Sequence, residues 1–175
     1  MEVLEPLRDR PTTSEALLST GRTLSLLVLL VLLAWATGQP FLFPSLGPSA
    51  YALAVTPSAA TSQWQRTIGG HLFGVIGGLI AYHTIAPGLT VTDLPPAFSM
   101  PGLQLTGAGF VAVGLTTAAM LRTDLRHAPA CATTLIVGLG LLTSLLEAAI
   151  IMFAISALAV ADHVLPTTGV DEPPQ

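Results

Sequence analysis

The chain has 175 residues, of which 51% are hydrophobic and 9% are charged, and its formal net charge is −4. Soluble domains usually carry about a quarter charged residues, so this composition excludes a soluble globule and predicts an integral membrane protein. The chain contains no lysine and six arginines, so a nucleic-acid-binding surface, which needs clustered positive charge, is not expected.

The first apolar run predicts the first membrane span. Residues 1–17 are polar and interrupted by proline, and we expect them to form a tail outside the membrane domain. The span follows at about 18–37, with Arg22 near its start and Trp35 near its end, where interfacial anchors are often found. Because acidic residues precede this run and no clean small-residue cleavage site follows it, we interpret it as a retained span and not as a signal peptide.

The next segment, 37–66, is apolar enough to enter the bilayer but contains four prolines, which prevent one regular transmembrane helix. We expect an extended stretch followed by a short helix that begins near 47–49 and ends near Ala60. Irregular backbone at membrane depth is tolerated only where protein or a water-filled cavity covers it. This segment is therefore predicted to lie in the interior of the protein.

Two further spans are predicted at about 67–85 and 103–121, joined by a loop without basic residues. After a charged stretch that ends at His127, the apolar run 129–160 is too long for one helix across ~30 Å of hydrocarbon. It is also too short for two full spans of ~20 residues each. It therefore predicts a second short helix followed by a fourth span.

The predicted elements fall into two similar halves. Repeat one, 18–86, and repeat two, 103–162, each have the order full span, broken short helix, full span. Together they form a single transmembrane domain, 18–165, followed by an acidic C-terminal tail, 166–175. The predicted fold is all-α: four transmembrane helices plus two short broken or re-entrant helices in a two-fold, inverted internal repeat. Corresponding interrupted segments in two halves are a sequence pointer to a transporter site.

The positions of the arginines favour the inverted arrangement. If each short helix completes a crossing, all six arginines fall on one side of the membrane, which the positive-inside rule makes cytoplasmic together with the N-terminus. In the alternative, both short segments enter and return, which places Arg66 outside and makes the two halves parallel. We expect the protein in the cell membrane.

Three stretches resemble the HPP family of small multi-pass membrane proteins, which is named after a His-Pro-Pro signature. They are FLFPSLGPSA at 41–50, IGGHL at 68–72 and HAPACATTL at 127–135. The resemblance covers roughly residues 20–162 and implies four transmembrane helices. Plant chloroplast members of that family are described as nitrite transporters, so the resemblance also implies transport of a nitrite-like oxyanion.

The signature itself is altered in this chain. It reads His127-Ala128-Pro129, and Ala128 and Cys131 stand where the family pattern has a proline and a glycine. The histidine, the second proline, Ala130 and Thr133 match the pattern. A bulkier, weakly polar side chain at the start of the helix is expected to change which solute fits.

The two short helices predict an anion site. A helix N-terminus presents unpaired amides and about half a positive charge, so it binds anions without a formal charge in the membrane. We expect both N-termini to face one central cavity, with hydroxyl donors beside them, arginines at the inner mouth, and His127 to gate or carry a proton. The predicted substrate-binding residues are Ser45, Gly47, Pro48, Ser49, Arg66, His71, Arg126, His127, Pro129, Ala130, Cys131, Thr133 and Thr134.

Structural roles compete with these assignments and stay open at this point. Hydroxyls in membrane helices often bond to backbone, arginines often anchor at the interface, and Arg122 can pair with Asp124. Glu147 is either a functional charge or sits at the start of the fourth span, where a helix N-terminus favours a carboxylate. Three glycines recur every four residues and predict a packing face, within the subunit or between subunits: Gly70, Gly74 and Gly78.

The predicted function is that of a channel or secondary transporter for a small inorganic anion. The alternative is a membrane scaffold or sensor that transports nothing. No catalytic residue, cofactor or metal site is predicted, because the apolar interior lacks the convergent acids, bases and metal ligands that an enzyme needs. The expected partners are the anion, the lipid bilayer and further copies of the chain in a homo-oligomer.

Overall fold

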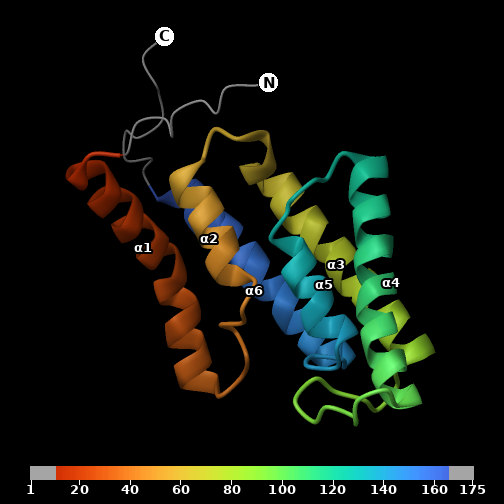
Figure 1. Ribbon diagram of the computed structural model, residues 1–175. Helices are drawn as coiled ribbons and strands as arrows, with labels where there is room; N and C mark the ends of the chain where they lie inside the picture. The colour runs from red at the N-terminus through yellow and green to blue at the C-terminus, as the bar shows by residue number, and fades with distance from the viewer. Residues whose placement is uncertain (1–10, 166–175) are drawn as a thin grey trace.

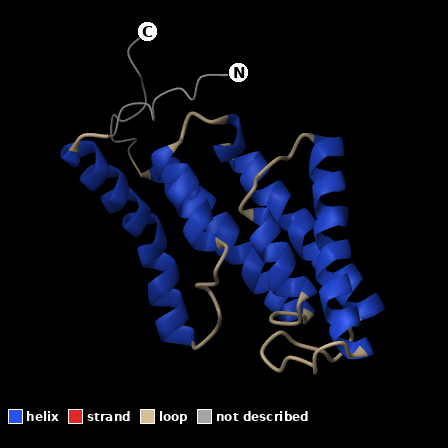
Figure 2. Ribbon diagram, viewed as in Figure 1, coloured by secondary structure: helices blue, strands red, loops and turns tan. Residues whose placement is uncertain are grey.

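Six α-helices and one short 3₁₀ turn make up the part of the chain that the computed structural model describes, residues 11–165 (Figures 1 and 2). The elements are α1 (Thr13–Thr37), α2 (Leu46–Val55), η1 (Ala60–Ser62), α3 (Trp64–Ile85), α4 (Met100–Thr123), α5 (Ala130–Gly138) and α6 (Leu145–Val164). No strand occurs within residues 11–165. Residues 1–10 of the predicted N-terminal tail and the whole predicted C-terminal tail, 166–175, lie outside the described residues.

Four of the helices, α1, α3, α4 and α6, are long and apolar enough to cross a membrane. The shortest of them has 20 residues, which at about 1.5 Å per residue matches the ~30 Å of the hydrocarbon core. The predicted all-α fold with four transmembrane helices and two short helices is therefore confirmed.

The first helix begins at Thr13, five residues earlier than predicted. Thr12 and Glu15 form a capping box, in which the Thr12 side chain accepts from the Glu15 amide and the Glu15 carboxylate accepts from the Thr12 amide at 2.7 Å. Such a box satisfies two of the free amides at a helix start. The polar residues assigned to the tail therefore supply the first turn of α1.

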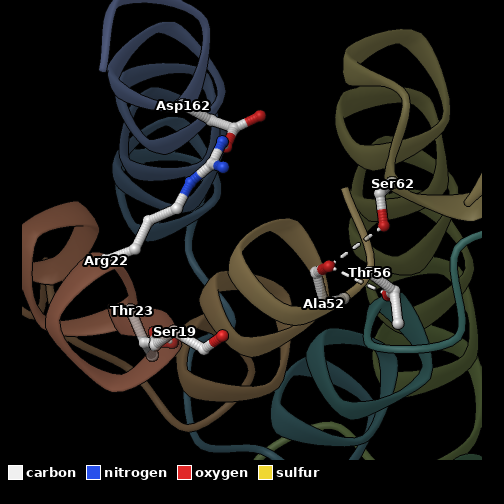
Figure 3. Close-up of polar contacts among 7 residues, drawn as sticks. All are labelled: Ser19, Arg22, Thr23, Ala52, Thr56, Ser62 and Asp162. Carbon is white, nitrogen blue, oxygen red and sulfur yellow. Dashed lines mark hydrogen bonds and ion pairs between the residues drawn. The ribbon is translucent and has the colours of Figure 1, made fainter. Parts of the chain in front are cut away.

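The short helix α2 ends at Val55, five residues before the predicted end. Pro57 disfavours helical geometry at the residue before it, Thr56, so the helix stops there. The Ala52 carbonyl accepts hydrogen bonds from the Thr56 and Ser62 hydroxyls at 3.0 and 3.2 Å, which anchors η1 against the end of α2 (Figure 3).

Figure 1 shows how the chain runs up and down the bundle. After α1 descends, the extended residues 38–45 turn back into the bundle and α2 continues to the upper end, from which α3 descends. After α4 rises, residues 124–129 turn back inward, α5 continues to the lower end, and α6 returns to the top. Each short helix thus begins inside the bundle; the inverted two-fold relation between the halves stays a prediction.

The helices pack as two groups. Helix α3 contacts α4 and α5, and α4 also contacts α5, whereas α2 contacts α1 and α6. Helix α6 also packs on α3 and so joins the groups. Two of the predicted stripe glycines touch α5 closely: a Cβ added to Gly74 would lie 2.8 Å from the Ala130 carbonyl oxygen, and one added to Gly78 would lie 2.6 Å from the Val137 Cβ. The predicted glycine packing face is confirmed, and it packs within the subunit.

One ion pair ties the outermost helix, α1, to α6. Arg22 Nη2 lies 2.9 Å from Asp162 Oδ1 (Figure 3), and the Arg22 side chain is 4% exposed. The Arg22 Nε is buried without a hydrogen-bond partner among the described residues. Because a buried guanidinium is costly unless it is paired, Asp162 is what allows Arg22 to face the protein interior.

Candidate functional site

The two short helices begin next to each other in the interior. Ser45 is the N-cap residue of α2, and Thr133 lies in the first turns of α5. Their hydroxyl oxygens are 2.6 Å apart, and both residues are fully buried. Pro48 and Pro129 stand at the starts of these helices, where a missing amide hydrogen breaks no helical bond. The two helix starts therefore lie in direct contact in the interior, and the central cavity that the sequence suggested between them stays a prediction.

Two histidines complete what we call the buried polar cluster, which consists of Ser45, Ser49, His71, His127 and Thr133. The Ser49 Oγ lies 3.0 Å from His71 Nε2 and 3.2 Å from His127 Nε2. The His71 Nδ1 lies 2.7 Å from Thr133 Oγ1. All five residues are at most 1% exposed. The cluster thus joins α2, α3, α5 and the segment that leads into α5.

The backbone of η1 contacts the cluster from the upper end. The His127 Nδ1 lies 2.8 Å from the Thr61 carbonyl oxygen. His71 and His127 are close neighbours, with ring centroids 5.2 Å apart. The sequence did not point to Thr61, because a backbone carbonyl carries no residue-type signal.

Not every predicted binding residue faces the cluster. Gly47 and Pro48 are exposed, because the helical period that turns Ser45 and Ser49 inward turns these two outward. Cys131 and Pro129 are half-buried. Of the predicted residues at the start of α2, only Ser45 and Ser49 therefore face the cluster.

The remaining two α5 candidates contact α3 and α4. Ala130 is fully buried beside the glycine face of α3. The Thr134 hydroxyl bonds to Thr116 of α4 at 3.0 Å and to the Ala130 carbonyl at 3.1 Å. Thr116 in turn bonds to the Phe73 carbonyl of α3. Thr134 therefore holds α5 against its neighbours.

The predicted arginines lie together, but they are paired. Asp124 accepts hydrogen bonds from both Arg66 and Arg126, whereas the sequence suggested Arg122 as its partner. Asp124 caps α4 in the left-handed conformation, with φ of 58°, and this turn brings Arg126 back toward its carboxylate. The hydrogen bond from Arg126, followed by the charges of Arg126 and Arg66, lowers the pKa of Asp124 below its ordinary value. Two arginines with one carboxylate leave a net positive charge near the start of α3.

Thr67 was not among the predicted site residues, but it lies close to the cluster on α3. Thr67, one turn before His71 on α3, is fully buried, and its hydroxyl has no partner among the described residues. Its spacing of four residues from His71 places both side chains on one face of α3, and this spacing could have identified Thr67 from the sequence.

Glu147 is a capping residue in this structure. It accepts hydrogen bonds from the Thr143 and Ser144 amides at 2.8 Å and so caps α6. Within residues 11–165, no group of three or more His, Cys, Asp or Glu side chains is placed to hold a metal ion.

A family comparison shows to which group of proteins the sequence is related. The family described as HPP, transmembrane region, matches residues 8–166. The chain belongs to the HPP family. Its altered signature, His127-Ala128-Pro129, is the segment that leads into α5 and carries one histidine of the buried polar cluster. No curated protein and no solved structure matches this HPP protein.

Proposed function

We propose that this HPP protein transports a small inorganic anion, which binds where the N-termini of α2 and α5 meet. The observation that carries the proposal is the 2.6 Å contact between Ser45 and Thr133 at two helix starts in the buried interior. Helix N-termini attract negative charge through the helix dipole, and the hydroxyls add donors that reorient at little cost. The amides of Ala130, Cys131 and Ala132 at the start of α5 donate to preceding carbonyls, so the hydroxyls are the donors on which the proposal depends. A nitrite-like oxyanion is the first substrate to test, because it is small and accepts hydrogen bonds.

The cluster also suggests how the anion is admitted. Its hydroxyls and imidazoles already bond to one another, so an anion must replace the Ser45–Thr133 hydrogen bond. Replacing this bond requires the two helix starts to separate. This favours a carrier with a closed resting state over a permanently open pore.

The arginines at the upper end fit a mouth that concentrates anions. Arg66 and Arg126 share the single carboxylate of Asp124, so their combined field stays positive. The positive-inside rule then makes this end cytoplasmic, with the protein in the cell membrane and the N-terminus inside. Reaction of single cysteines placed at Arg126 and at exposed Phe98 with an impermeant thiol reagent, in a Cys131→Ala background, tests this orientation.

Anion flux into proteoliposomes tests the proposed function. We expect nitrite uptake above that of protein-free vesicles, and a drop of at least tenfold for the double variant Ser45→Ala/Thr133→Val, which removes both hydroxyls at the helix starts. The matched control is Ser156→Ala/Thr106→Val, because these hydroxyls bond only to carbonyls of their own helices. Absence of flux of nitrite, formate and chloride in well-folded protein would favour a scaffold or sensor.

We also propose that the protein forms a homo-oligomer. Four spans enclose little volume, and Gly107 and Gly114 on α4 have open space around them, which a second copy can approach. Mass measurement in detergent and in nanodiscs tests this proposal. A single-chain mass in both environments would rule it out.

A further inference from the structure

The hydrogen bonds of the buried polar cluster have directions that can be worked out from His127. The Thr61 carbonyl can only accept, so His127 Nδ1 carries a hydrogen and donates it. In a neutral ring the other nitrogen, Nε2, is then an acceptor. Its partner is the Ser49 hydroxyl, whose one hydrogen has two acceptors: the Ser45 carbonyl oxygen at 3.0 Å and His127 Nε2 at 3.2 Å. The Ser45 carbonyl also accepts from the Ser49 amide, so Ser49 can donate to His127 in the neutral cluster.

The bond from Ser49 to His127 determines the form of His71 that goes with it. When the Ser49 hydrogen points to His127, His71 Nε2 donates to the Ser49 oxygen. The His71 Nδ1 is then an acceptor and takes the Thr133 hydroxyl hydrogen, and Thr133 accepts from Ser45. All bonds of the neutral cluster thus point in one sequence, from Ser45 through Thr133, His71 and Ser49 to His127.

One added proton can be held by both rings. If His127 gains a proton at Nε2, it donates to Ser49, and Ser49 can donate to His71 Nε2 when His71 carries its own hydrogen at Nδ1. Movement of one proton from His127 to Ser49 and of another from Ser49 to His71 then transfers the charge between the rings. No proton is gained or lost in this exchange.

The two hydroxyls at the helix starts reverse when the added proton is on His71, because both ring nitrogens then carry a hydrogen. With a hydrogen on His71 Nδ1, Thr133 must accept from His71 and donate to Ser45. The Ser45 hydrogen is then released from Thr133 and can be donated to an anion. A positive charge and a free donor therefore arise together beside the N-terminus of α2.

The surroundings leave this charge without a fixed counter-ion. Helices α2 and α5 bring hydroxyls to the rings, and η1 brings a carbonyl. The neighbouring charged groups, Arg66 of α3 with Asp124 and Arg126, bond to one another, and the described residues give neither ring a carboxylate partner. An uncompensated buried charge is costly, so a proton and an anion stabilise each other in this site.

We propose that His71 and His127 share one proton through Ser49 and that this proton is transported together with one anion. This inference rests on the proposed anion transport. It assigns Ser49 as the bridge between the rings and makes transport electrically neutral. His127 is the ring nearer to solvent, because its partner Thr61 lies at the exposed upper end.

Proteoliposomes with the membrane potential clamped at zero test the coupling. A pH difference of one unit, acid outside, is expected to drive about tenfold accumulation of nitrate, as one proton per anion requires. Nitrate is the probe because its acid is fully ionised and does not cross the bilayer as a neutral molecule. Changing the clamped potential is expected to leave the accumulation unchanged.

Variants separate the coupling from transport itself. His71→Gln, His127→Gln and Ser49→Ala are each expected to abolish the pH-driven accumulation, measured as the steady-state ratio of nitrate inside to outside and not as a rate, whereas the control His83→Gln, an exposed histidine outside the cluster, keeps it. Wild-type flux that ignores the pH gradient and responds to potential would overturn the proton proposal and leave anion transport intact. Absence of any flux would instead overturn the proposed function. If the variants fail to fold, the wild-type ratio of protons to anions decides alone.

Discussion

Gly74 of α3 lies against the backbone of Ala130 at the start of α5, so close that an added Cβ would be 2.8 Å from the Ala130 carbonyl oxygen. Neither partner can give way easily, because this carbonyl also accepts from Thr134. We expect Gly74→Ala to destabilise the protein by about 1–3 kcal/mol, the usual cost of overpacking. Unfolding in detergent, followed by circular dichroism, measures the change.

Gly21→Ala on α1 is the matched control for Gly74→Ala, because the position of its added Cβ has no atom of another segment within 4 Å. It is expected to leave stability unchanged or slightly higher, since alanine favours a helix more than glycine does. Equal losses for both variants would contradict the close packing of α3 on α5.

The ion pair between Arg22 and Asp162 gives a second prediction. Asp162→Asn leaves the Arg22 guanidinium buried without a counter-charge, and we expect a loss of about 1–3 kcal/mol, below the full cost for a buried pair because Asp162 is 22% exposed. Asp93→Asn, in the exposed loop after α3, is the control. If the two variants unfold alike, the pair does not hold α1 to α6.

A substitution at Glu147 tests whether this residue only caps α6 or also takes part in transport. Glu147→Ala removes the acceptor for the Thr143 and Ser144 amides, so we expect a loss of about 1 kcal/mol in stability and unchanged anion flux in the folded protein. Flux and thermal unfolding are measured on the same preparation. A variant with wild-type stability and no flux would assign Glu147 to the transport path instead.

The lowered pKa of Asp124 predicts that the stability of the folded protein depends on pH. The Arg126 hydrogen bond and the nearby charges lower its pKa from the ordinary 3.8, so the ionised group stabilises the folded protein above that value. This contribution is lost as the pH falls through the lowered pKa. Wild-type protein is therefore expected to lose stability between pH 5 and strongly acidic pH more steeply than Asp124→Asn. Asparagine also accepts the left-handed conformation, so this variant isolates the charge.

Asp124→Asn also tests the arginines at the upper mouth. Without the carboxylate, Arg66 and Arg126 exert a stronger positive field, so anion flux at low salt is expected to rise about two- to fivefold and the increase to fall at high salt. Flux that does not depend on salt in either protein would show that these arginines only anchor the connection between α4 and α5.

The sequence predicted the number and order of the helices because their patterns are local. Apolar length marks the four spans, and proline with small residues marks the two interrupted segments. The ends were less accurate where short-range chemistry decides them. The capping box of Thr12 and Glu15 extended α1, and Pro57 shortened α2.

The sequence predicted which residues form the site better than it predicted the hydrogen bonds between them. Ser45, Ser49, His71, His127 and Thr133 do come together, whereas Gly47 and Pro48 lie on the opposite face of α2 because of the helical period. Which hydroxyl bonds to which ring depends on contacts between segments far apart in the chain. No local sequence pattern predicts that Arg66 pairs with Asp124, 58 positions away, or that the Thr61 carbonyl accepts from His127.

The division of the bundle has a mechanical consequence. Ser45 and Ser49 lie at the start of α2, which packs on α1, whereas His71 and Thr133 belong to the group of α3, α4 and α5, and His127 leads into it; α6 packs on both sides. The cluster's side-chain bonds to Ser45 and Ser49 therefore join α2 to this group, while Thr134 and Thr116 are joined within it. A small movement of α1 and α2 relative to α3, α4 and α5 would break the bonds to Ser45 and Ser49 and leave the bond between Thr134 and Thr116 intact.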